Sequence, residues 1–468
     1  MPRAAIVSWR TFGTPSTSSL GPLHSVFMTT GPESAAHVES TDAEAMTDLT
    51  KKIGPLLLIS VLIGIGGALA ASLFLAVESG LQTLIWTDIP AKMGLGETAS
   101  WYVLAALLVG AIVVLLAQKL PGKTGASPIS GFHFDVGPGT IASVALAALG
   151  TLAFGLVLGP EAPLIACGTA LGGLVMRGRG PQAVQLGMLL GGVAGIGAIF
   201  GNPLITAFMI LEFAALGPLP AAALLPVLVA LGSGYIVEIG LGPWSGLGTH
   251  SLALPGLPAF PGLTVVNIVG GLVIGVIASI VALIARELGE RVDDASKKRP
   301  TPILFAVAIV TALLAIGTHL ITGEGYETVL FSGQEAMPTI LGITSVGTLL
   351  VILVAKFIAY GLALGGGFRG GPIFPAVFLG VTIGTIASLI VPDLTLPGMA
   401  AVGIAATTAA MTKLPFTGTM LGVLLISSAG GAVTPLAIIG AVIGFMARTA
   451  LDRYDAKRGD VAIPVKIA

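Results

Sequence analysis

Long apolar runs recur along almost the whole chain, and they limit what it can fold into more than any other feature. The 468 residues are 54% hydrophobic and 10% charged, whereas a soluble domain usually carries roughly 25% charged residues. The runs cover residues 54–77, 102–117, 141–158, 183–200, 203–216, 220–237, 264–285, 302–321, 340–363, 373–391, 398–411, 415–428 and 434–449. Lipid is therefore expected to surround most of the chain.

The runs favour membrane helices over a membrane barrel. Barrel strands need segments of about ten residues that alternate in polarity, and the run PLLLISVLIGIGGALAASLFLAV does not alternate. Several runs are shorter than the roughly 20 residues of a straight span, and Gly or Pro opens many of them. We predict an all-α polytopic membrane protein with broken and re-entrant helices that are buried inside protein.

An internal repeat divides the chain. GPEAPLIACGTALG at 159–172 is similar to GPIFPAVFLGVTIG at 371–384, an offset of 212 residues, and Pro203 meets Pro415 at the same offset. The match predicts two related halves on either side of a Gly- and Pro-rich linker. The expected segments are a disordered tail at 1–48, a first repeat at 49–240, a linker at 241–261, a second repeat at 262–452 and a short tail at 453–468.

The basic residues predict that the two halves are inverted. Residues 286–299 carry five Lys or Arg, and their counterparts at 74–87 carry none. The basic residues at 119–123 and 177–179 also lack basic counterparts. Because Lys and Arg concentrate in cytoplasmic loops, equivalent loops lie on opposite sides, with both termini cytoplasmic. Inverted repeats place a substrate near the bilayer midplane, where discontinuous helices meet, although a neutral scaffold can also arise by duplication.

Glu161 is the main candidate for function. Helix starts are predicted at GPEAP, at GPIFP and after GASP, and unpaired N–H groups at such starts bind anions. The alternative to an anion site is an ordinary Pro in the first turn of a helix, which is common in proteins of all kinds. An ionisable residue inside an apolar span is costly and by default functional, and the repeat places Ile373 opposite Glu161. The alternative is a structural glutamate capped by backbone N–H groups.

The ordered motifs resemble those of the chloride channel (CLC) and transporter family. GPEAP is similar to the family motif Gly-Arg/Lys-Glu-Gly-Pro, and GGGFRGGPIFP to its Gly-x-Phe-x-Pro region. GASPIS stands where Gly-Ser-Gly-Ile-Pro belongs, and FGNPLITAFMILEF resembles the Asn-x-Pro-Leu to Glu segment. The resemblance covers roughly residues 50–450. It implies a voltage-gated chloride channel or a chloride/proton antiporter, of bacterial type without CBS domains, that works as a homodimer.

The resemblance implies a role for several residues. Glu161 corresponds to the gating glutamate, and Ser127 to the hydroxyl that binds the central anion, with Ser130 as the fallback if the register slips. Ile373 and Phe374 correspond to backbone donors at the second helix start. Protonation of Glu161 would then vacate an anion site and couple gating or exchange to protons.

The departures from the family pattern leave both functions possible, a channel and an exchanger. Pro160 replaces the basic residue of the glutamate motif, and Ile373 replaces a phenylalanine. Glu212 stands at the first position of the family's Glu-Glu pair, but Phe213 takes the second, where exchangers often carry an internal proton-transfer glutamate. Tyr454 is a poor counterpart of the family's central tyrosine, so that ligand is expected to be absent.

The remaining candidates are weaker. Arg369 could either attract anions or satisfy backbone carbonyls, and His133 with Asp135 is too small a set for a metal site. No cofactor, metal, enzyme activity or nucleic-acid partner is predicted, and the single Cys167 excludes an internal disulfide. The expected partners are chloride or similar anions, protons and membrane lipid, at the plasma membrane. The alternative function is transport of another anion, such as fluoride or an organic anion.

Overall fold

A computed structural model of the chain describes residues 32–95, 99–122, 124–216, 223–245 and 253–458. By contacts between residues the chain divides into Met1–Pro55 and Leu56–Ala468, and the helical bundle below belongs to the second unit. The helices of the first half are α1 (Pro32–Thr83), α2 (Ile89–Lys92), α3 (Ser100–Ala117), α4 (Ile141–Leu152), α5 (Glu161–Val175), α6 (Pro181–Phe200), α7 (Pro203–Leu216) and α8 (Leu224–Ser245). Those of the second half are α9 (Val265–Lys298), α10 (Pro300–Thr322), α11 (Met337–Gly342), α12 (Val346–Gly365), α13 (Ile373–Ile390), α14 (Leu396–Thr412), α15 (Pro415–Leu425) and α16 (Thr434–Arg458).

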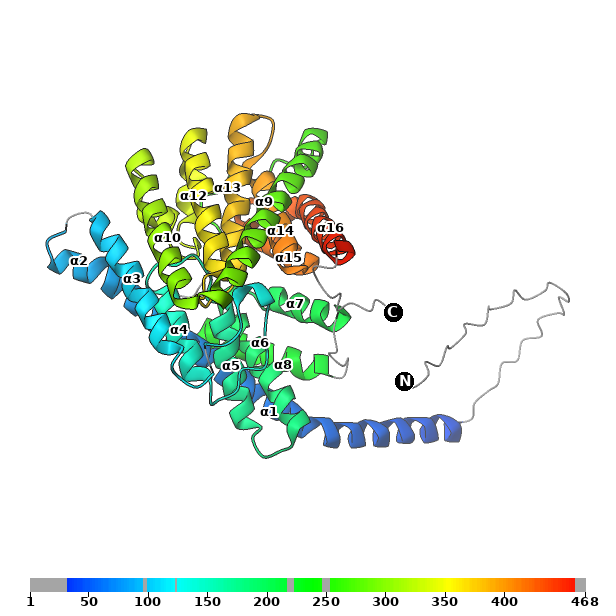
Figure 1. Cartoon of the computed structure of the whole chain (residues 1–468). Helices are drawn as coiled ribbons and strands as arrows, with labels where there is room; N and C mark the ends of the chain where they lie inside the picture. The colour runs from blue at the N-terminus through cyan, green and yellow to red at the C-terminus, as the bar shows by residue number, and fades with distance from the viewer. Residues whose placement is uncertain (1–31, 96–98, 123, 217–222, 246–252, 459–468) are drawn as a thin grey trace. The chain divides into compact units, whose positions relative to one another are not determined.

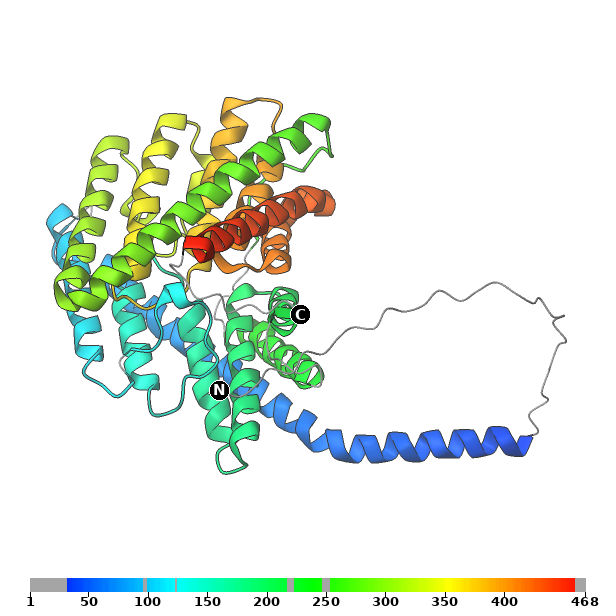
Figure 2. The same ribbon diagram turned by 45° about the vertical axis from the view of Figure 1, so that its right-hand side comes forward.

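The predicted fold class is confirmed. Within the described residues, eight helices are long and apolar enough to cross a membrane, and six further apolar helices are shorter. In the second half, α10, α12 and α13 lie side by side (Figure 1). The long helix α9 packs against α12, α14 and α16, and Figure 2 shows it running across this bundle.

The predicted repeat is present in the helix boundaries. Helices α5 and α13 begin at Glu161 and Ile373, and 373 − 161 = 212. Helices α6 and α14 end at Phe200 and Thr412, again 212 residues apart. Equivalent segments therefore fold alike in the two halves, and the chain is an inverted repeat with helices that stop and restart inside the protein.

Glycine pairs hold the same helix crossing in both halves. Gly168 of α5 meets Gly191 of α6, where a β-carbon on either residue would collide with the other's backbone. Their repeat-mates Gly380 and Gly403 make the equivalent contact between α13 and α14. Small residues allow such close backbone approach, which is how membrane helices gain packing energy without a hydrophobic driving force.

A two-residue bridge joins the halves. Gly159 and Gly371 form an isolated antiparallel bridge, with Gly159 N donating to Gly371 O at 2.8 Å and Gly371 N to Gly159 O at 2.5 Å. These glycines lie two residues before the starts of α5 and α13. The bridge therefore brings the two helix starts together at the seam between the repeats.

The amino-terminal expectation is wrong in part. Residues 1–48 were expected to be a disordered tail, but α1 begins at Pro32, so residues 32–48 are helical. Proline suits a first helical turn, and the stretch from 33 to 53 contains neither Gly nor Pro and is rich in helix-forming Ala and Glu. Residues 1–31 lie outside the described part of the chain.

Two other expected boundaries shift. Helix α8 continues to Ser245, so the linker expected at 241–261 begins later. Helix α16 continues to Arg458, so the tail expected at 453–468 also begins later. At its end α16 continues through the largely charged residues RYDAKR at 453–458, whereas α8 continues through LGPWS at 241–245. The remaining domain limits stay predictions.

The helix expected after GASP is reduced to one turn. Pro128–Ser130 form a single 3-10 turn, which ends at Gly131 with a φ of 89°. The Gly- and Pro-rich loop that follows delays the next helix to Ile141. A single turn aligns few peptide dipoles, so the argument from helix-end partial charge applies to α5 and α13 and not to this segment.

Candidate functional site

The side chain of Glu161 is completely buried at the seam between the repeats. Its Oε1 accepts a hydrogen bond from the backbone N–H of Phe374 at 2.9 Å. Its Oε2 is also buried and has no hydrogen-bond partner among the described residues. A carboxylate of the first repeat therefore occupies the helix start of the second repeat, and only one of its two oxygens is bound.

The sequence around the two helix starts provides this arrangement. Pro160 and Pro372 precede Glu161 and Ile373 at the starts of α5 and α13. Proline presets the helical φ and has no N–H of its own to satisfy. The first N–H groups of α13 lack partners within the helix, and their partial positive charge favours an anion. Phe374 N–H is one of these groups.

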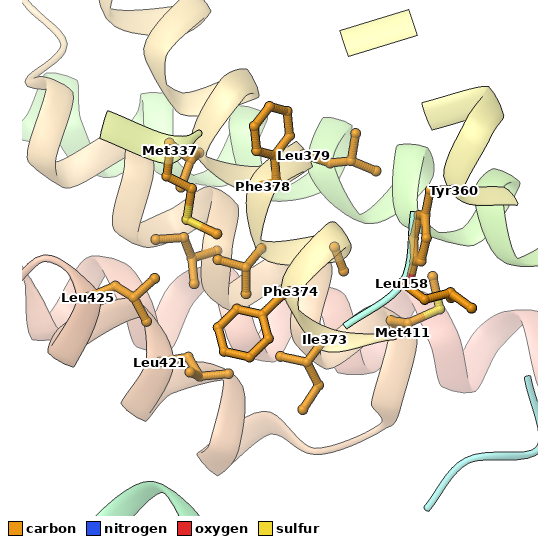
Figure 3. Close-up of a cluster of buried hydrophobic side chains, with 14 of the residues drawn as sticks. Leu158, Met337, Tyr360, Ile373, Phe374, Phe378, Leu379, Met411, Leu421 and Leu425 are labelled. Atoms are coloured by element: carbon orange, nitrogen blue, oxygen red, sulfur yellow. The ribbon is translucent and has the colours of Figure 1, made fainter. Parts of the chain in front are cut away.

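Apolar side chains surround the start of α13. Figure 3 shows Ile373 and Phe374 there, in a cluster with Leu158, Met411 and Leu421. Ile373 and Phe374 are completely buried. In such surroundings a charge gains little from solvent, so its interaction with the helix N–H groups is strong.

Tyr360 fixes the segment that leads into α13. Its hydroxyl, buried on α12, donates to the carbonyl oxygen of Pro372 at 2.7 Å. This bond orients the peptide groups at the start of the helix. Tyr360 was not singled out from the sequence, because nothing in its local pattern indicates a partner on another helix start.

Two cavities reach the seam. The first measures about 430 Å³ and its lining includes Pro160. The second measures about 300 Å³ and its lining includes Pro372, the repeat-mate of Pro160. Glu161 lines neither cavity, since its side chain is enclosed by protein at the seam. The linings of the two cavities therefore reach the prolines before the starts of α5 and α13, where the Glu161 carboxylate is buried.

The two cavities carry charges of opposite sign. Three glutamates line the first, which we call the acidic cavity: Glu78, Glu327 and Glu335. Three cations line the second, which we call the basic cavity: Arg286, Lys413 and Arg448. Within their described linings, neither cavity contains a charged residue of the other sign. The basic cavity thus suits anions and the acidic cavity repels them.

Ser127 lies beside a third, smaller cavity of about 40 Å³ that also contacts Ala162 and Pro163 in the first turn of α5. Its hydroxyl donates to Asp293 Oδ1 on α9 at 3.2 Å. The predicted anion ligand is therefore near the seam, but its hydrogen faces a carboxylate in this structure. The volume is enough for one water molecule or small ion.

Ser130 and Arg369 line different cavities. Ser130 lines the basic cavity, and its hydroxyl donates to Ser127 O at 2.6 Å. Arg369 borders the small cavity, but its guanidinium donates to Thr124 O at 3.1 Å and to Phe368 O at 3.0 Å. Arg369 therefore satisfies backbone carbonyls, which is the second of the two roles considered for it.

Glu212 is a helix cap. Its Oε1 accepts from Phe416 N at 2.6 Å, and its Oε2 accepts from Thr417 N at 2.9 Å and from the Thr417 hydroxyl at 2.6 Å. Both carboxylate oxygens are thus bound at the start of α15. Glu161 and Glu212 each reach from the first repeat to a helix start of the second, but only Glu161 keeps an oxygen without a partner.

Lys356 on α12 is a buried ionisable residue that the sequence analysis did not single out. It is completely buried, and its Nζ donates to Leu330 O at 2.6 Å and to Phe331 O at 3.0 Å. The ammonium also lies 4.7 Å from the ring centroid of Phe378. The rule that selected Glu161, an ionisable residue within an apolar run, would have found Lys356 as well.

Among the described residues, no three His, Cys, Asp or Glu side chains are grouped closely enough to hold a metal ion. His133 Nδ1 and Asp135 Oδ1 are 4.0 Å apart, and Asp135 is largely exposed.

Comparison with known proteins identifies the fold. Residues 105–429 match the family described as voltage gated chloride channel. The chain belongs to this family. Membership in the voltage gated chloride channel family makes it an integral, multi-pass membrane protein of anion transport.

Similar proteins agree with this assignment. The putative ion-transport proteins YfeO of Salmonella paratyphi A and Salmonella choleraesuis are each 26% identical over 335 residues, which is 69% of this chain and 78% of theirs. A slow cyanobacterial Cl-/H+ antiporter matches with a TM-score of 0.69 at 17% identity, over 86% of this chain and 99% of that one. A CLC-type fluoride/proton antiporter matches with a TM-score of 0.63 at 20% identity, over 85% and 96%. These structural likenesses show the voltage gated chloride channel fold.

Proposed function

We propose that the protein carries chloride or similar small anions between the acidic and the basic cavity, and that Glu161 is the gate. The observation that supports this most directly is the half-satisfied carboxylate. Glu161 Oε1 takes the N–H of Phe374, and Oε2 is buried without a partner. An unsatisfied buried oxygen is costly, so the closed state is held only weakly.

Protonation opens the proposed gate. A neutral carboxyl group no longer gains from the partial charge of the α13 start, so it gives up the Phe374 N–H to a passing anion. The anion then takes the place of the carboxylate. Because the donor is a backbone N–H and not a full charge, binding stays weak enough for release.

The neighbouring groups complete the proposed path. Ser127 supplies a hydroxyl donor beside the first turn of α5 once an anion displaces Asp293 from it. Ile373 and Phe374 supply backbone N–H groups, whereas Pro372 has none. The basic cavity opens to the cytoplasm and the acidic cavity to the outside, on the argument from the basic residues at 286–299.

The assembly is proposed to be a homodimer in the plasma membrane, with one anion path in each subunit and with both termini cytoplasmic. The support is the family fold, together with the outward-facing apolar side chains of α9 that need lipid or a partner.

A reversal-potential measurement in a planar bilayer tests the function. Purified protein is placed under combined chloride and pH gradients, and fluoride replaces chloride in a second series. A reversal potential that follows chloride alone indicates a channel, and one displaced by the pH gradient indicates exchange. An absence of chloride current and flux in a folded protein would reject the proposal, and selective fluoride current would favour the alternative substrate.

The gate is tested in the same preparation with Glu161→Gln. The variant is neutral at every pH, so we expect anion flux with little pH dependence and no proton coupling. Glu287→Gln is the matched control, because Glu287 is an exposed glutamate that pairs with Arg291 on α9. A Glu161→Gln protein that is folded and keeps the pH response of the control would refute the gate.

A further inference from the structure

A cavity of about 270 Å³ adjoins the acidic cavity, and we call it the aromatic cavity. The linings of the two cavities share Glu327, Phe331 and Glu335. The aromatic cavity adds the rings of Trp86, just after α1, and Tyr326, in the turn that follows α10. It therefore lies between a segment of the first repeat and the loop at 326–335 of the second.

The composition of this lining is unusual for the chain. Of its nine described residues, three are aromatic, two are glutamates and the other four carry a hydroxyl or an amide. Among them there is no Ala, Val, Leu, Ile or Met, and no Lys or Arg. A lipid tail would find few aliphatic contacts here, and an anion would be repelled by the two carboxylates. The lining instead suits a cation.

Trp86 and Phe331 form a corner of the cavity. Their ring centroids are 5.3 Å apart and their planes are inclined by 75°. The indole N–H of Trp86 donates to Ala153 O at 3.0 Å, which fixes the orientation of that ring. Both rings are only half-buried. Because a cation within about 6 Å of an aromatic centroid is attracted to the ring, one small cation can contact both.

The backbone is irregular at both rings. Phe331 has a φ of 59°, in the left-handed region that bulky side chains disfavour. Its N–H donates to Gly155 O at 3.1 Å, and its carbonyl oxygen accepts from the Nζ of Lys356 at 3.0 Å. Trp86 lies in the π-helical turn Leu84–Asp88, a rare form that is often found at functional sites. The fold therefore holds both rings beside the cavity in uncommon conformations.

The carboxylates favour a cation larger than a metal ion. Glu327 and Glu335 are exposed, and among the described residues no three His, Cys, Asp or Glu side chains are grouped closely enough to bind a metal. Ca²⁺ takes roughly six to eight oxygen ligands, and aromatic rings supply none. An alkylammonium ion needs only an opposite charge nearby and aromatic surface for its alkyl groups.

We propose that the aromatic cavity binds a small alkylammonium ion. The rings of Trp86, Tyr326 and Phe331 contact its alkyl groups, and Glu327 and Glu335 supply the opposite charge. Glu161 and the basic cavity take no part, so the site is separate from the proposed anion gate.

Calorimetric titration with choline chloride tests the site in the purified, full-length protein in a non-ionic detergent. Sodium chloride in the cell matches the choline chloride in the syringe, so the chloride concentration stays constant. The uncharged ligand 3,3-dimethylbutan-1-ol has the shape of choline without its charge. We expect choline to bind, and the alcohol to bind at least about tenfold more weakly, because it gains neither the cation–π attraction nor the attraction to the carboxylates.

Two variants separate the aromatic and the acidic contributions. Trp86→Leu should raise the choline Kd about threefold or more, as loss of one cation–π contact implies. Its matched control is Trp101→Leu, because Trp101 is 56% exposed and lies outside the lining. Glu335→Gln should raise the choline Kd about three- to fivefold and leave the affinity for the alcohol unchanged. Its control is Glu287→Gln, an exposed glutamate on α9.

Glu335→Gln keeps the test decisive if Trp86→Leu folds poorly, because Glu335 is exposed and its amide should not lower Tm. An absence of choline binding to the wild type would overturn the site, as would an equal choline Kd in Glu335→Gln. Equal affinity for choline and the alcohol would also overturn it, and tighter binding of Ca²⁺ than of choline would show a metal site instead. The titration measures no flux, so choline binding in a protein that does not transport chloride supports this site and contradicts the proposed function alone.

Discussion

The carboxylate of Glu161 occupies the space that a β-carbon on Gly371 would fill. A side chain there would collide with Glu161 Oε2, and one on Gly159 would collide with the same oxygen. The pair that bridges the two repeats therefore also forms the recess for the buried carboxylate. Neither glycine has a positive φ among the described residues, so close approach explains both positions better than backbone conformation does.

Gly371→Ala should expel the Glu161 carboxylate from the α13 start. Alanine tolerates the backbone conformation at Gly371, so the main conflict is with Glu161, whose flexible end can move. We expect anion flux from liposomes to rise and its pH dependence to weaken, as in Glu161→Gln. Gly317→Ala is the control, since Gly317 in α10 has open space around it. Unchanged flux and pH response in folded Gly371→Ala would contradict this reading.

Glu212→Gln should destabilise the protein without changing its pH response. The amide can accept at one oxygen only, so at least one donor at the start of α15 is left buried and unpaired. We expect a loss of about 1–3 kcal/mol, visible as a lower Tm in detergent. Glu287→Gln should leave Tm unchanged. If Glu212→Gln instead abolished the pH dependence of flux at wild-type Tm, Glu212 would be a proton carrier and not a cap.

Ser127→Ala should shift anion selectivity. The hydroxyl is a side-chain donor in the lining of the small cavity that touches the first turn of α5, and its loss removes one of the groups that could bind the anion there. The nitrate-to-chloride permeability ratio in bilayers measures the effect. Ser388→Ala, near the far end of α13, is the control, because Ser388 bonds only within its own helix, to Thr385 O at 2.9 Å. An unchanged ratio would transfer the role to Ser130 or to the backbone.

Accessible cysteines should report the inverted topology. Ser79 beside the acidic cavity and Lys298 at the end of α9 are both exposed, and Ser296, in the last turn of the same helix as Lys298, is buried. In a Cys167→Ala background, Ser79→Cys and Lys298→Cys should react with a membrane-impermeant maleimide from opposite sides of the bilayer. Reaction from the same side would remove the argument from the basic loops.

The helix starts were predictable from the sequence because the residues next to them determine where each helix begins. Gly and Pro before Glu161 and Ile373 indicate a break followed by a helix, and the 212-residue offset carries one half's boundaries onto the other. The hydroxyl of Ser127 was not predictable in the same way. Its partner Asp293 lies 166 residues away on a long helix, and no periodicity in either segment encodes that contact.

The lining of the basic cavity was also not predictable from the sequence. Arg286, Lys413 and Arg448 come from α9, the end of α14 and α16, and each alone looks like an ordinary basic residue at a membrane boundary. These three residues line one cavity only because the three helices pack together. Lys356 is different, because its place within an apolar run was visible in the sequence and was overlooked.

The opposite charges of the two cavities make the proposed path electrically asymmetric. Fixed cations raise the local anion concentration on the Arg448 side, and fixed glutamates lower it on the Glu335 side. If the proposed path joins the two cavities, we expect it to rectify in equal salt solutions, because anions are supplied at a higher local concentration from the basic side than from the acidic side. The Debye length falls from about 10 Å at 0.1 M salt to about 3 Å at 1 M, so concentrated electrolyte brings the current-voltage relation closer to a straight line.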